Sequence, residues 1–320
     1  MLTLAEVKAA AARLTGKTHH TPLLYSRTLS KLAGNEIYLK CENLQKTGSF
    51  KARGAINAVA QLSTEAKARG VVTGSSGNHG QALAYAAREF GVKAVVVMPE
   101  DASLAKRQAC EAYGGTVLLC GITAEARLAK AAELVAKEGY TLVHPFDDPH
   151  IIAGQGTLSL EVLADLPDLD CVVAPVGGGG LLGGVSLATK ESRPRVQVIG
   201  VEPAVSPRLR HAWQAGAVTE LSDDAWQPSI ADGLRARRPG ELPFALSRAY
   251  VDDLVTVSES EIAAALRLIL ERVKLVVEPS GAVSVAAAIN GRLGFTGKKV
   301  VCVLSGGNAE LAKLVKLGLL

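Results

Sequence analysis

The chain has 320 residues, a formal net charge of +4 and 48% hydrophobic residues, which is enough for a sizeable core in about two domains. Aromatic residues make up only 4%, which argues against base-stacking surfaces, so we expect no nucleic-acid partner. Five cysteines without a C-x-x-C pair, and no apolar run of about 18 residues, predict a cytoplasmic protein with no membrane association.

The first half of the chain shows strands that alternate with helices. The apolar spacing predicts helices at 4–14 and 52–62 and a strand at 37–40. From residue 71 onward the pattern predicts strands at 71–73, 94–98, 116–119 and 141–143, each separated from the next by a helix. This alternation is typical of a parallel sheet that is covered on both faces.

A loop at 144–149 holds two prolines and two acids, and it predicts a domain junction. Beyond it the pattern predicts helices at 155–165, 181–191, 262–273, 281–289 and 309–317 and strands at 171–176, 196–201 and 299–304, while 221–250 reads as a long irregular connection over a site. We therefore expect an α/β fold with two open, mainly parallel sheet domains and helices on both faces. Residues 1–69 and 148–320 would form the large domain, and 70–147 the small one.

Lys51 follows a polar, glycine-containing turn and opens the helix predicted after it. The positive end of a helix dipole disfavours a charged amine at that position. A neutral amine there could form a Schiff base, although most single lysines are solvated surface groups.

Four consecutive glycines, Gly177 to Gly180, lead from an apolar strand into a helix. Backbone amides at a helix N-terminus favour an anion, most naturally a phosphate, although glycines also allow close packing of a helix on a sheet. The same residues fit G-x-G-x-x-G, and Glu202 closes the next strand at the distance of a ribose-binding acid. An NAD-dependent oxidoreductase is therefore the alternative from another enzyme class.

Two further polar loops follow predicted strands. Ser75-Ser76-Gly77-Asn78-His79-Gly80 exposes backbone amides and side-chain donors, which suits a carboxylate, and Ser305-Gly306-Gly307-Asn308 follows the last strand. Open α/β sheets bind ligands at the carboxyl ends of their strands, so the three loops are expected to converge. One amine, one phosphate cradle and one carboxylate cradle predict pyridoxal phosphate bound to Lys51, with an amino acid as substrate.

From about Thr21 to Asn308 the sequence resembles the threonine and serine dehydratases and serine racemases, which are pyridoxal-phosphate enzymes of the tryptophan-synthase-β type. The motifs that carry the resemblance are Lys46-Thr47-Gly48-Ser49-Phe50-Lys51-Ala52-Arg53-Gly54, Ser75-Ser76-Gly77-Asn78-His79-Gly80-Gln81-Ala82, Ala153-Gly154-Gln155-Gly156-Thr157, Gly177 to Gly180, Glu278-Pro279-Ser280-Gly281 and Ser305-Gly306-Gly307-Asn308. Their presence in this order makes a chance resemblance very improbable. The resemblance implies that the cofactor lies in the cleft between the two domains.

The resemblance also implies roles for individual residues. Lys51 would form the Schiff base and Ser76 would face it across the cofactor ring, as the two catalytic residues. The cofactor would further contact Phe50, Asn78, Gly177, Gly178, Gly179, Gly180, Leu181, Gly233, Glu278 and Ser305. The substrate carboxylate would be bound by Ser75, Ser76, Asn78 and His79.

The activity implied by the resemblance is β-elimination of L-threonine or L-serine, or both, to a 2-oxo acid and ammonia. Racemisation of serine, or dehydration of a modified β-hydroxy amino acid, is the alternative within the family. The family also suggests a homodimer or a larger homo-oligomer. Members that bind a divalent cation use a Glu-Pro pair and an acid six residues later; Glu202-Pro203 is present here, but position 208 is arginine, so we do not expect that metal site.

Overall fold

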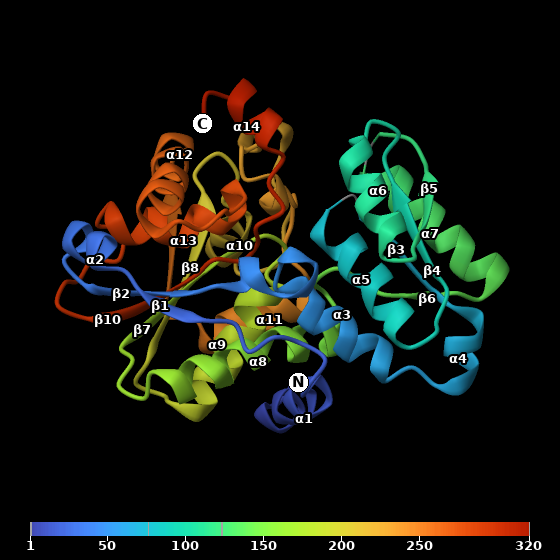
Figure 1. Cartoon of the computed structure of the whole chain (residues 1–320), viewed down its shortest axis with the longest axis horizontal. Helices are drawn as coiled ribbons and strands as arrows, with labels where there is room; N and C mark the ends of the chain where they lie inside the picture. The colour runs from blue at the N-terminus through green and yellow to red at the C-terminus, as the bar shows by residue number, and fades with distance from the viewer. Residues whose placement is uncertain (1, 76, 123, 320) are drawn as a thin grey trace.

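The computed structural model describes residues 2–75, 77–122 and 124–319. Their strands form two sheets, of six and of four strands (Figure 1). The larger sheet runs in the order β1 (Leu23–Tyr25), β2 (Glu36–Lys40), β10 (Lys299–Val303), β7 (Cys171–Pro175), β8 (Gln197–Pro203) and β9 (Asp253–Val257). The smaller runs in the order β5 (Thr116–Leu119), β4 (Ala94–Met98), β3 (Val71–Gly74) and β6 (Thr141–Leu142). All neighbouring strands are parallel except β1 and β2.

Helices connect and cover the strands. The α-helices are α1 (Leu4–Leu14), α2 (Arg27–Ala33), α3 (Lys51–Ala60), α4 (Thr64–Arg69), α5 (Asn78–Glu89), α6 (Leu104–Ala112), α7 (Ala124–Glu138), α8 (Pro149–Asp165), α9 (Gly180–Ser192), α10 (Arg208–Ala215), α11 (Glu241–Tyr250), α12 (Glu259–Leu268), α13 (Pro279–Ile289) and α14 (Leu311–Lys316). Short 3₁₀ turns are η1 (Glu42–Leu44), η2 (Lys46–Gly48), η3 (Asp223–Ala225) and η4 (Asp232–Leu234), and η5 (Ile269–Val273) is a π-helical turn.

Strand β7 shows why the sequence of a central strand in the larger sheet is apolar at every position. Cys171 and Val173 pack in the apolar cluster that includes side chains of α2, α12 and α13. Val172 and Ala174 point the other way, into a cluster with residues of α8 and α9. Successive strand residues face opposite sides, so a strand that is covered on both faces is apolar at every position.

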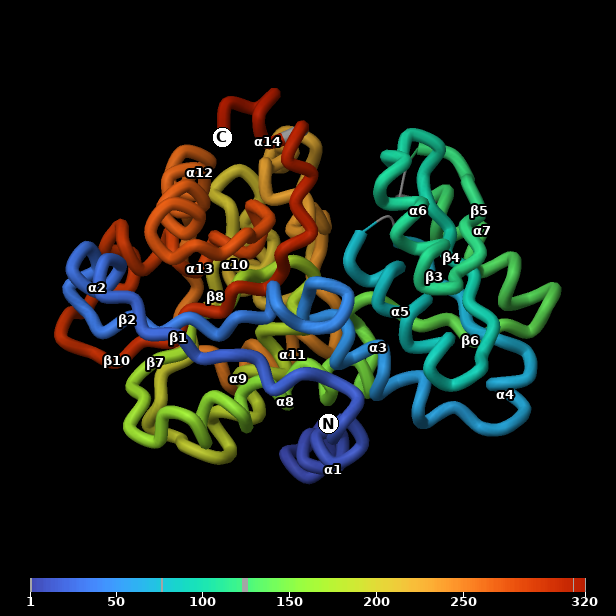
Figure 2. Tube along the Cα trace, viewed as in Figure 1, coloured from blue at the N-terminus to red at the C-terminus, as the bar shows by residue number. Residues whose placement is uncertain are grey.

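The smaller sheet is covered in the same way. Val95 and Val97 of β4 pack with Ala131 of α7, whereas Val96 and Met98 pack with residues of α5 and α6. The two-sheet architecture, with helices on both faces of each sheet, confirms the predicted fold class. In Figure 2 the chain leaves the six-stranded part after α3, completes the four-stranded part and returns before α8. The exact domain boundaries, 69/70 and 147/148, stay a prediction.

Two regions differ from the sequence-based expectation. Helix α8 begins at Pro149 and not near residue 155, because the Asp148 side chain accepts hydrogen bonds from the N–H groups of His150 and Ile151 and caps the helix. The predicted irregular connection 221–250 contains α11, and β9 follows it as an edge strand on β8. Pro243 lies in the first turn of α11, where proline removes no helical hydrogen bond.

The predicted helix 262–273 is also divided in the structure. It begins earlier, at Glu259, and its last turn is the π-helical η5. In the part of the chain that the structure describes, no helix has both the length and the apolar character needed to cross a membrane.

Candidate active site

Lys51 is the first residue of α3, and its side chain reaches the loop that follows β6. Its Nζ donates a hydrogen bond to the carbonyl oxygen of Pro145 at 2.7 Å and lies 5.0 Å from the centre of the Phe50 ring. Burial lowers the pKa of the Lys51 amine from 10.5 to about 8, and the opposing charge of Glu278 limits this shift. A substantial fraction of the amine is therefore neutral near pH 8, and the cause is burial, where the sequence argument had invoked the helix dipole.

The segment before Lys51 is attached to the loop that follows β10. The Phe50 N–H donates to the carbonyl oxygen of Ser305 at 3.1 Å, and Ser49 forms an isolated β-bridge with Gly306. A second contact joins the Gly307 N–H to the carbonyl oxygen of Gly48 at 2.8 Å. Two of the predicted loops, far apart in sequence, thus lie side by side.

The glycine turn follows β7 and opens α9. Gly179 has φ +94°, a conformation that favours glycine, and it is the N-cap of the helix. A Cβ atom on Gly178 would lie 2.3 Å from the Phe146 ring, so a side chain there would overlap the ring. Leu181 is only 5% exposed and packs in the core, so it can offer a ligand only its backbone N–H. The turn presents main-chain amides at the positive end of a helix, an anion cradle.

Loop Ser75–His79 follows β3 and opens α5. The Ser75 hydroxyl accepts a hydrogen bond from the Gly77 N–H at 3.4 Å, and Asn78 is the first residue of the helix. Ser76, the second predicted catalytic residue, lies outside the described residues. The loop can bind a carboxylate through the free amides of the α5 N-terminus.

The His79 ring is not an acid or a base in this arrangement. Its Nε2 lies 3.1 Å from the carbonyl oxygen of Val143, and burial together with the charge of Lys51 lowers its pKa to about 3. The ring is therefore neutral at working pH, and Nε2 must carry the proton because a carbonyl can only accept. His79 is 2% exposed, so a substrate would meet its main chain.

Ser305 and Gly233 meet at Ser280, a residue to which the sequence analysis assigned no role in the site. The Ser305 hydroxyl donates to the carbonyl oxygen of Ser280 at 3.4 Å, and the Gly233 N–H donates to the Ser280 hydroxyl at 3.0 Å. A Cβ atom on Gly177 would lie 3.2 Å from the carbonyl oxygen of Gly233, so the 3₁₀ turn η4 borders the glycine turn. The motif Glu278-Pro279-Ser280-Gly281 was the available sequence signal.

Glu278 and Asn78 connect the two sheets across the cleft. The Asn78 amide donates to Glu278 Oε1 at 2.8 Å, and Asn308 donates both to Asn78 Oδ1 and to the carbonyl oxygen of Thr47, each at 2.8 Å. Glu278 is 6% exposed, and burial, with the charge of Asp232, raises its pKa to about 8. The carboxyl group is thus poised to change its charge near neutral pH.

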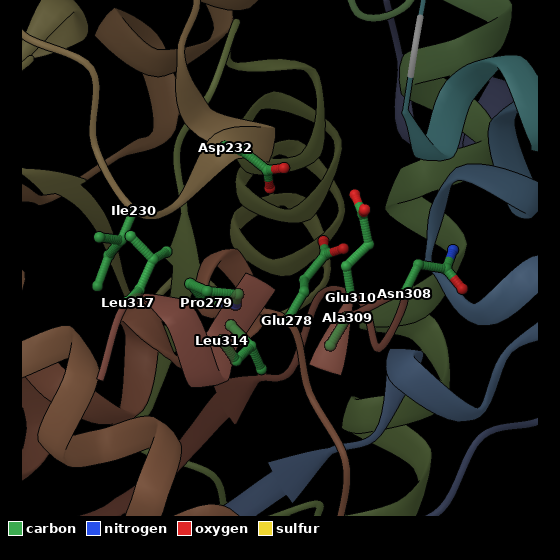
Figure 3. Close-up of a pocket in the computed structure, with 9 residues that line it drawn as sticks. All are labelled: Ile230, Asp232, Glu278, Pro279, Asn308, Ala309, Glu310, Leu314 and Leu317. Atoms are coloured by element: carbon green, nitrogen blue, oxygen red, sulfur yellow. The ribbon is translucent and has the colours of Figure 1, made fainter. Parts of the chain in front are cut away.

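Three carboxylates gather beside this bridge. Figure 3 shows Asp232, Glu278 and Glu310 pointing toward the same space, around a cavity of about 20 Å³. The Nζ of Lys106, in α6, lies 3.2 Å from a carboxylate oxygen of Asp232 and 3.3 Å from one of Glu310. Lys106 therefore connects a helix that covers the smaller sheet to residues that lie beside the larger sheet. Sequence reasoning missed Lys106, Asp232 and Glu310, because no motif or spacing marks charges that meet only after folding.

Glu202, predicted as a ribose-binding acid in one reading and as a possible metal ligand in another, has a structural function here. It is fully buried, and its two carboxylate oxygens accept hydrogen bonds from the N–H groups of Leu209 and Arg210, each at 2.9 Å. Both oxygens cap α10 and are not available to a ribose. Among the described residues, no group of three or more His, Cys, Asp and Glu side chains is placed to hold a metal ion.

The residues present fit pyridoxal phosphate. A glycine turn with no room for side chains offers amides to a phosphate, and a partly exposed lysine with a lowered pKa offers an amine to an aldehyde. Ser305 offers a hydroxyl for a ring nitrogen, and the Asn78 amide can bind a ring hydroxyl. Asn308 joins the loop after β10 to Asn78, and η4 borders the glycine turn, so these loops lie near one another as the fit requires.

Comparison with known proteins gives the same result. Residues 14–306 match the family model described as pyridoxal-phosphate dependent enzyme. L-threonine ammonia-lyase of Thermotoga maritima is 47% identical over 311 residues, which cover 97% of this chain and 77% of that protein. L-threo-3-hydroxyaspartate ammonia-lyase of Saccharomyces cerevisiae is 39% identical over 315 residues, covering 98% and 96%.

Serine racemase of Dictyostelium discoideum is 42% identical over 318 residues, which cover 99% of this chain and 98% of that protein. A crystal structure of serine racemase from that organism matches with a TM-score of 0.90 over 97% of this chain and 99% of that one. These likenesses confirm the resemblance seen in the sequence and the expected cofactor. The chain belongs to the family of pyridoxal-phosphate dependent enzymes.

Proposed function

We propose that the protein is a pyridoxal-phosphate-dependent ammonia-lyase that converts L-threonine, L-serine, or both, to a 2-oxo acid and ammonia. The observation that carries the proposal is the Lys51 amine, which lies at the start of α3 and whose pKa burial lowers to about 8. The relatives named as ammonia-lyases support the reaction class. An NAD-dependent oxidoreductase is not supported, because Glu202 caps α10.

Some groups of the chain would bind the substrate, and Lys51 would transfer its proton. Bound pyridoxal phosphate supplies an electron sink for the charge left at the substrate's Cα. The amides at the start of α5 bind the substrate carboxylate, and the neutral Lys51 amine removes the Cα proton. The Cα–H and Cβ–O bonds break, and the hydroxyl leaves as water with the proton that Lys51 took from Cα, so the amine becomes neutral again. Hydrolysis of the resulting enamine releases ammonia and the 2-oxo acid.

Ser305 favours elimination over reactions that need a strong electron sink. A hydroxyl at the ring nitrogen, unlike a carboxylate, does not hold that nitrogen protonated. Ser305 is 3% exposed, and its hydroxyl, which donates to the carbonyl oxygen of Ser280 at 3.4 Å, would turn to donate to the unprotonated ring nitrogen. Negative charge at Cα is then less stabilised, so loss of the β-hydroxyl competes well with long-lived carbanions.

The substrate is tested with a panel of L-threonine, L-serine, D-serine and L-threo-3-hydroxyaspartate, with assays for 2-oxo acid and ammonia. We expect L-threonine or L-serine to react in the wild type and no reaction in Lys51→Ala, whose protein should also lose the yellow colour. Lys46→Ala is the matched control, since Lys46 lies over the Tyr85 ring, 5.6 Å from its centre. A colourless wild type, or an active Lys51→Ala, would contradict the proposal.

Racemisation of serine is the second candidate, favoured by the 42% identity to a serine racemase. By the family resemblance it needs Ser76 to return a proton on the side opposite Lys51. Ser76→Ala should then abolish conversion of L-serine to D-serine while elimination from the L-substrate largely persists. Chiral chromatography of the product mixture distinguishes the two reactions.

We further propose that the protein works as a homodimer or a larger homo-oligomer in the cytoplasm. Leu44 and Val276 are 45% and 49% exposed, on neighbouring loops joined by the hydrogen bond from Asn43 to the carbonyl oxygen of Val276. Exposed apolar side chains of this kind favour an interface. All five cysteines are free thiols, which suits a reducing compartment. Light scattering coupled to size exclusion measures the assembly.

A further inference from the structure

Arg208, at the start of α10, has a fully buried guanidinium group among oxygen atoms. Its Nη1 donates to the carbonyl oxygens of Val176 at 2.8 Å and Gly177 at 3.3 Å. Its Nη2 donates to the Ser206 hydroxyl at 2.8 Å and to the Ser206 carbonyl oxygen. Glu202 Oε1 lies 3.9 Å from Nη1 and supplies the opposite charge.

Through the carbonyl oxygens of Val176 and Gly177 the guanidinium contacts the glycine turn, Gly177 to Gly180, which we call the phosphate-binding turn from here on. A peptide group is planar, so the carbonyl of one residue and the N–H of the next point in opposite directions. Holding the Val176 and Gly177 carbonyls therefore also orients the N–H groups of Gly177 and Gly178. Glycine has no side chain to restrict its backbone dihedral angles, so hydrogen bonds from outside the turn have a large effect on the conformation of these residues.

The oxygens around the guanidinium are of the kind that bind hard cations. Carbonyls, a hydroxyl and a carboxylate are typical ligands of Mg²⁺ and Ca²⁺. Here they face a group that is permanently charged and that fills the space between them. A divalent cation could enter only by displacing a buried guanidinium, whose transfer from its oxygen partners would be unfavourable.

We propose that Arg208 is a built-in cation that positions the phosphate-binding turn, so that cofactor binding is independent of divalent metal ions. The residue acts through the Val176 and Gly177 carbonyls and does not touch the reacting atoms. The proposal rests on the family's cofactor and not on the proposed substrate. Binding measurements without substrate therefore test it even if the assignment as an ammonia-lyase fails.

The first experiment uses the wild-type protein. Apoprotein is titrated with pyridoxal phosphate, and separately with inorganic phosphate, in the presence of a chelator and then of Mg²⁺ or Ca²⁺. We expect the same dissociation constants in all conditions, and no stoichiometric heat when either metal is added alone. A dissociation constant that rises on chelation, or stoichiometric metal binding, overturns the proposal.

The second experiment compares substitutions at position 208. Arg208→Met should weaken binding of pyridoxal phosphate and of inorganic phosphate about tenfold or more, because the carbonyls lose charge-assisted donors. Arg208→Lys, which keeps the charge with a single donor group, should give an intermediate loss. Arg210→Met, two residues further along α10 at an exposed position, is the matched control and should bind as the wild type does.

Arg208→Asp separates a positioning role from a merely structural one. The new carboxylate beside Glu202 and the freed carbonyls would provide oxygen ligands for a divalent cation. We expect weak binding of pyridoxal phosphate in chelator and recovery when Mg²⁺ or Ca²⁺ is added. If Arg208→Met and Arg208→Asp bind as tightly as the wild type in chelator, or if soluble, folded Arg208→Asp shows no recovery with either metal, the proposal is wrong.

Discussion

The side-chain amide of Asn78 donates a 2.8 Å hydrogen bond to Glu278, although the two residues are 200 positions apart in the chain. Asn78 opens a helix that covers the four-stranded sheet, and Glu278 directly precedes α13, which covers the six-stranded one. The bond therefore joins the parts of the chain that carry the two sheets. Because the pKa of Glu278 is raised to about 8, the charge at one end of this bond depends on pH.

Glu278 should make the free energy of unfolding of the apoprotein fall as pH rises between about 4.5 and 8. Its pKa is raised from 4.5 to about 8 by burial, so the folded state holds this proton more tightly than the unfolded chain. The corresponding stability is fully present below pH 4.5 and is lost as pH rises through about 8. Glu278→Gln, which can still accept from Asn78, should therefore be more stable than the wild type by about 1–3 kcal/mol at pH 8–9 and similar to it near pH 4.

Urea denaturation of both proteins across this pH range measures the difference. A Glu278→Gln protein with the same pH dependence as the wild type would show that the carboxyl group titrates normally.

The rate at which apoprotein captures pyridoxal phosphate should rise between about pH 7 and 9, because only the neutral amine attacks an aldehyde. The midpoint reports the lowered pKa of Lys51, about 8. The charge of Glu278 raises that pKa, so Glu278→Gln should shift the midpoint to lower pH. Stopped-flow absorbance gives the rates, and Lys46→Ala should leave the midpoint in place. A midpoint near the ordinary lysine value would contradict the assigned environment.

Lys106→Met should loosen the cleft with little change in overall stability. Lys106 pairs with Asp232 and Glu310 in the part of the chain around the larger sheet, but all three side chains are about a quarter exposed. Partly exposed ion pairs of this kind each contribute less than about 1 kcal/mol to the free energy of unfolding. The two pairs of Lys106, however, connect a helix of the smaller sheet to loops beside the larger one. Hydrogen exchange of α6 should become several-fold faster, because local opening is favoured.

The matched control is Lys130→Met, since Lys130 pairs with Glu133 inside the single helix α7. Equal exchange rates in α6 for the two variants would argue that the Lys106 pairs do not hold the cleft closed.

Gly178→Ala should impair both folding and cofactor binding. The added methyl group would lie 2.3 Å from the Phe146 ring, and overpacking of this kind costs about 1–3 kcal/mol. The double variant Gly178→Ala/Phe146→Ala should regain part of the loss, which thermal unfolding and titration with pyridoxal phosphate can measure. Gly16 has open space around its Cβ position and a φ of +73°, so Gly16→Ala should lower the stability of the fold less, through the backbone strain alone. If the double variant regained neither stability nor cofactor binding, overlap with the Phe146 ring would not be the cause of the loss.

Local sequence patterns determined the β-α alternation, the glycine turn and the position of Lys51. Strand β7 is predictable because both of its faces are buried and every residue is apolar. Gly177 to Gly180 are recognisable because an anion cradle requires backbone without side chains. The start of α8 was misplaced because the Asp148 cap competes with a proline-rich loop pattern, and α11 was missed because three prolines in 221–250 outweighed its periodicity.

The partners of charged groups were decided by the tertiary structure alone. The sequence offered Glu202 as a ribose or metal ligand, but its two oxygens cap α10, and Arg208 reaches back to the glycine turn. Lys106 acquires its two carboxylate partners only when the sheets come together. The physical reason is that periodicity and turn chemistry act over a few residues, whereas the desolvation and pairing of a charge depend on atoms that the chain brings together from distant positions.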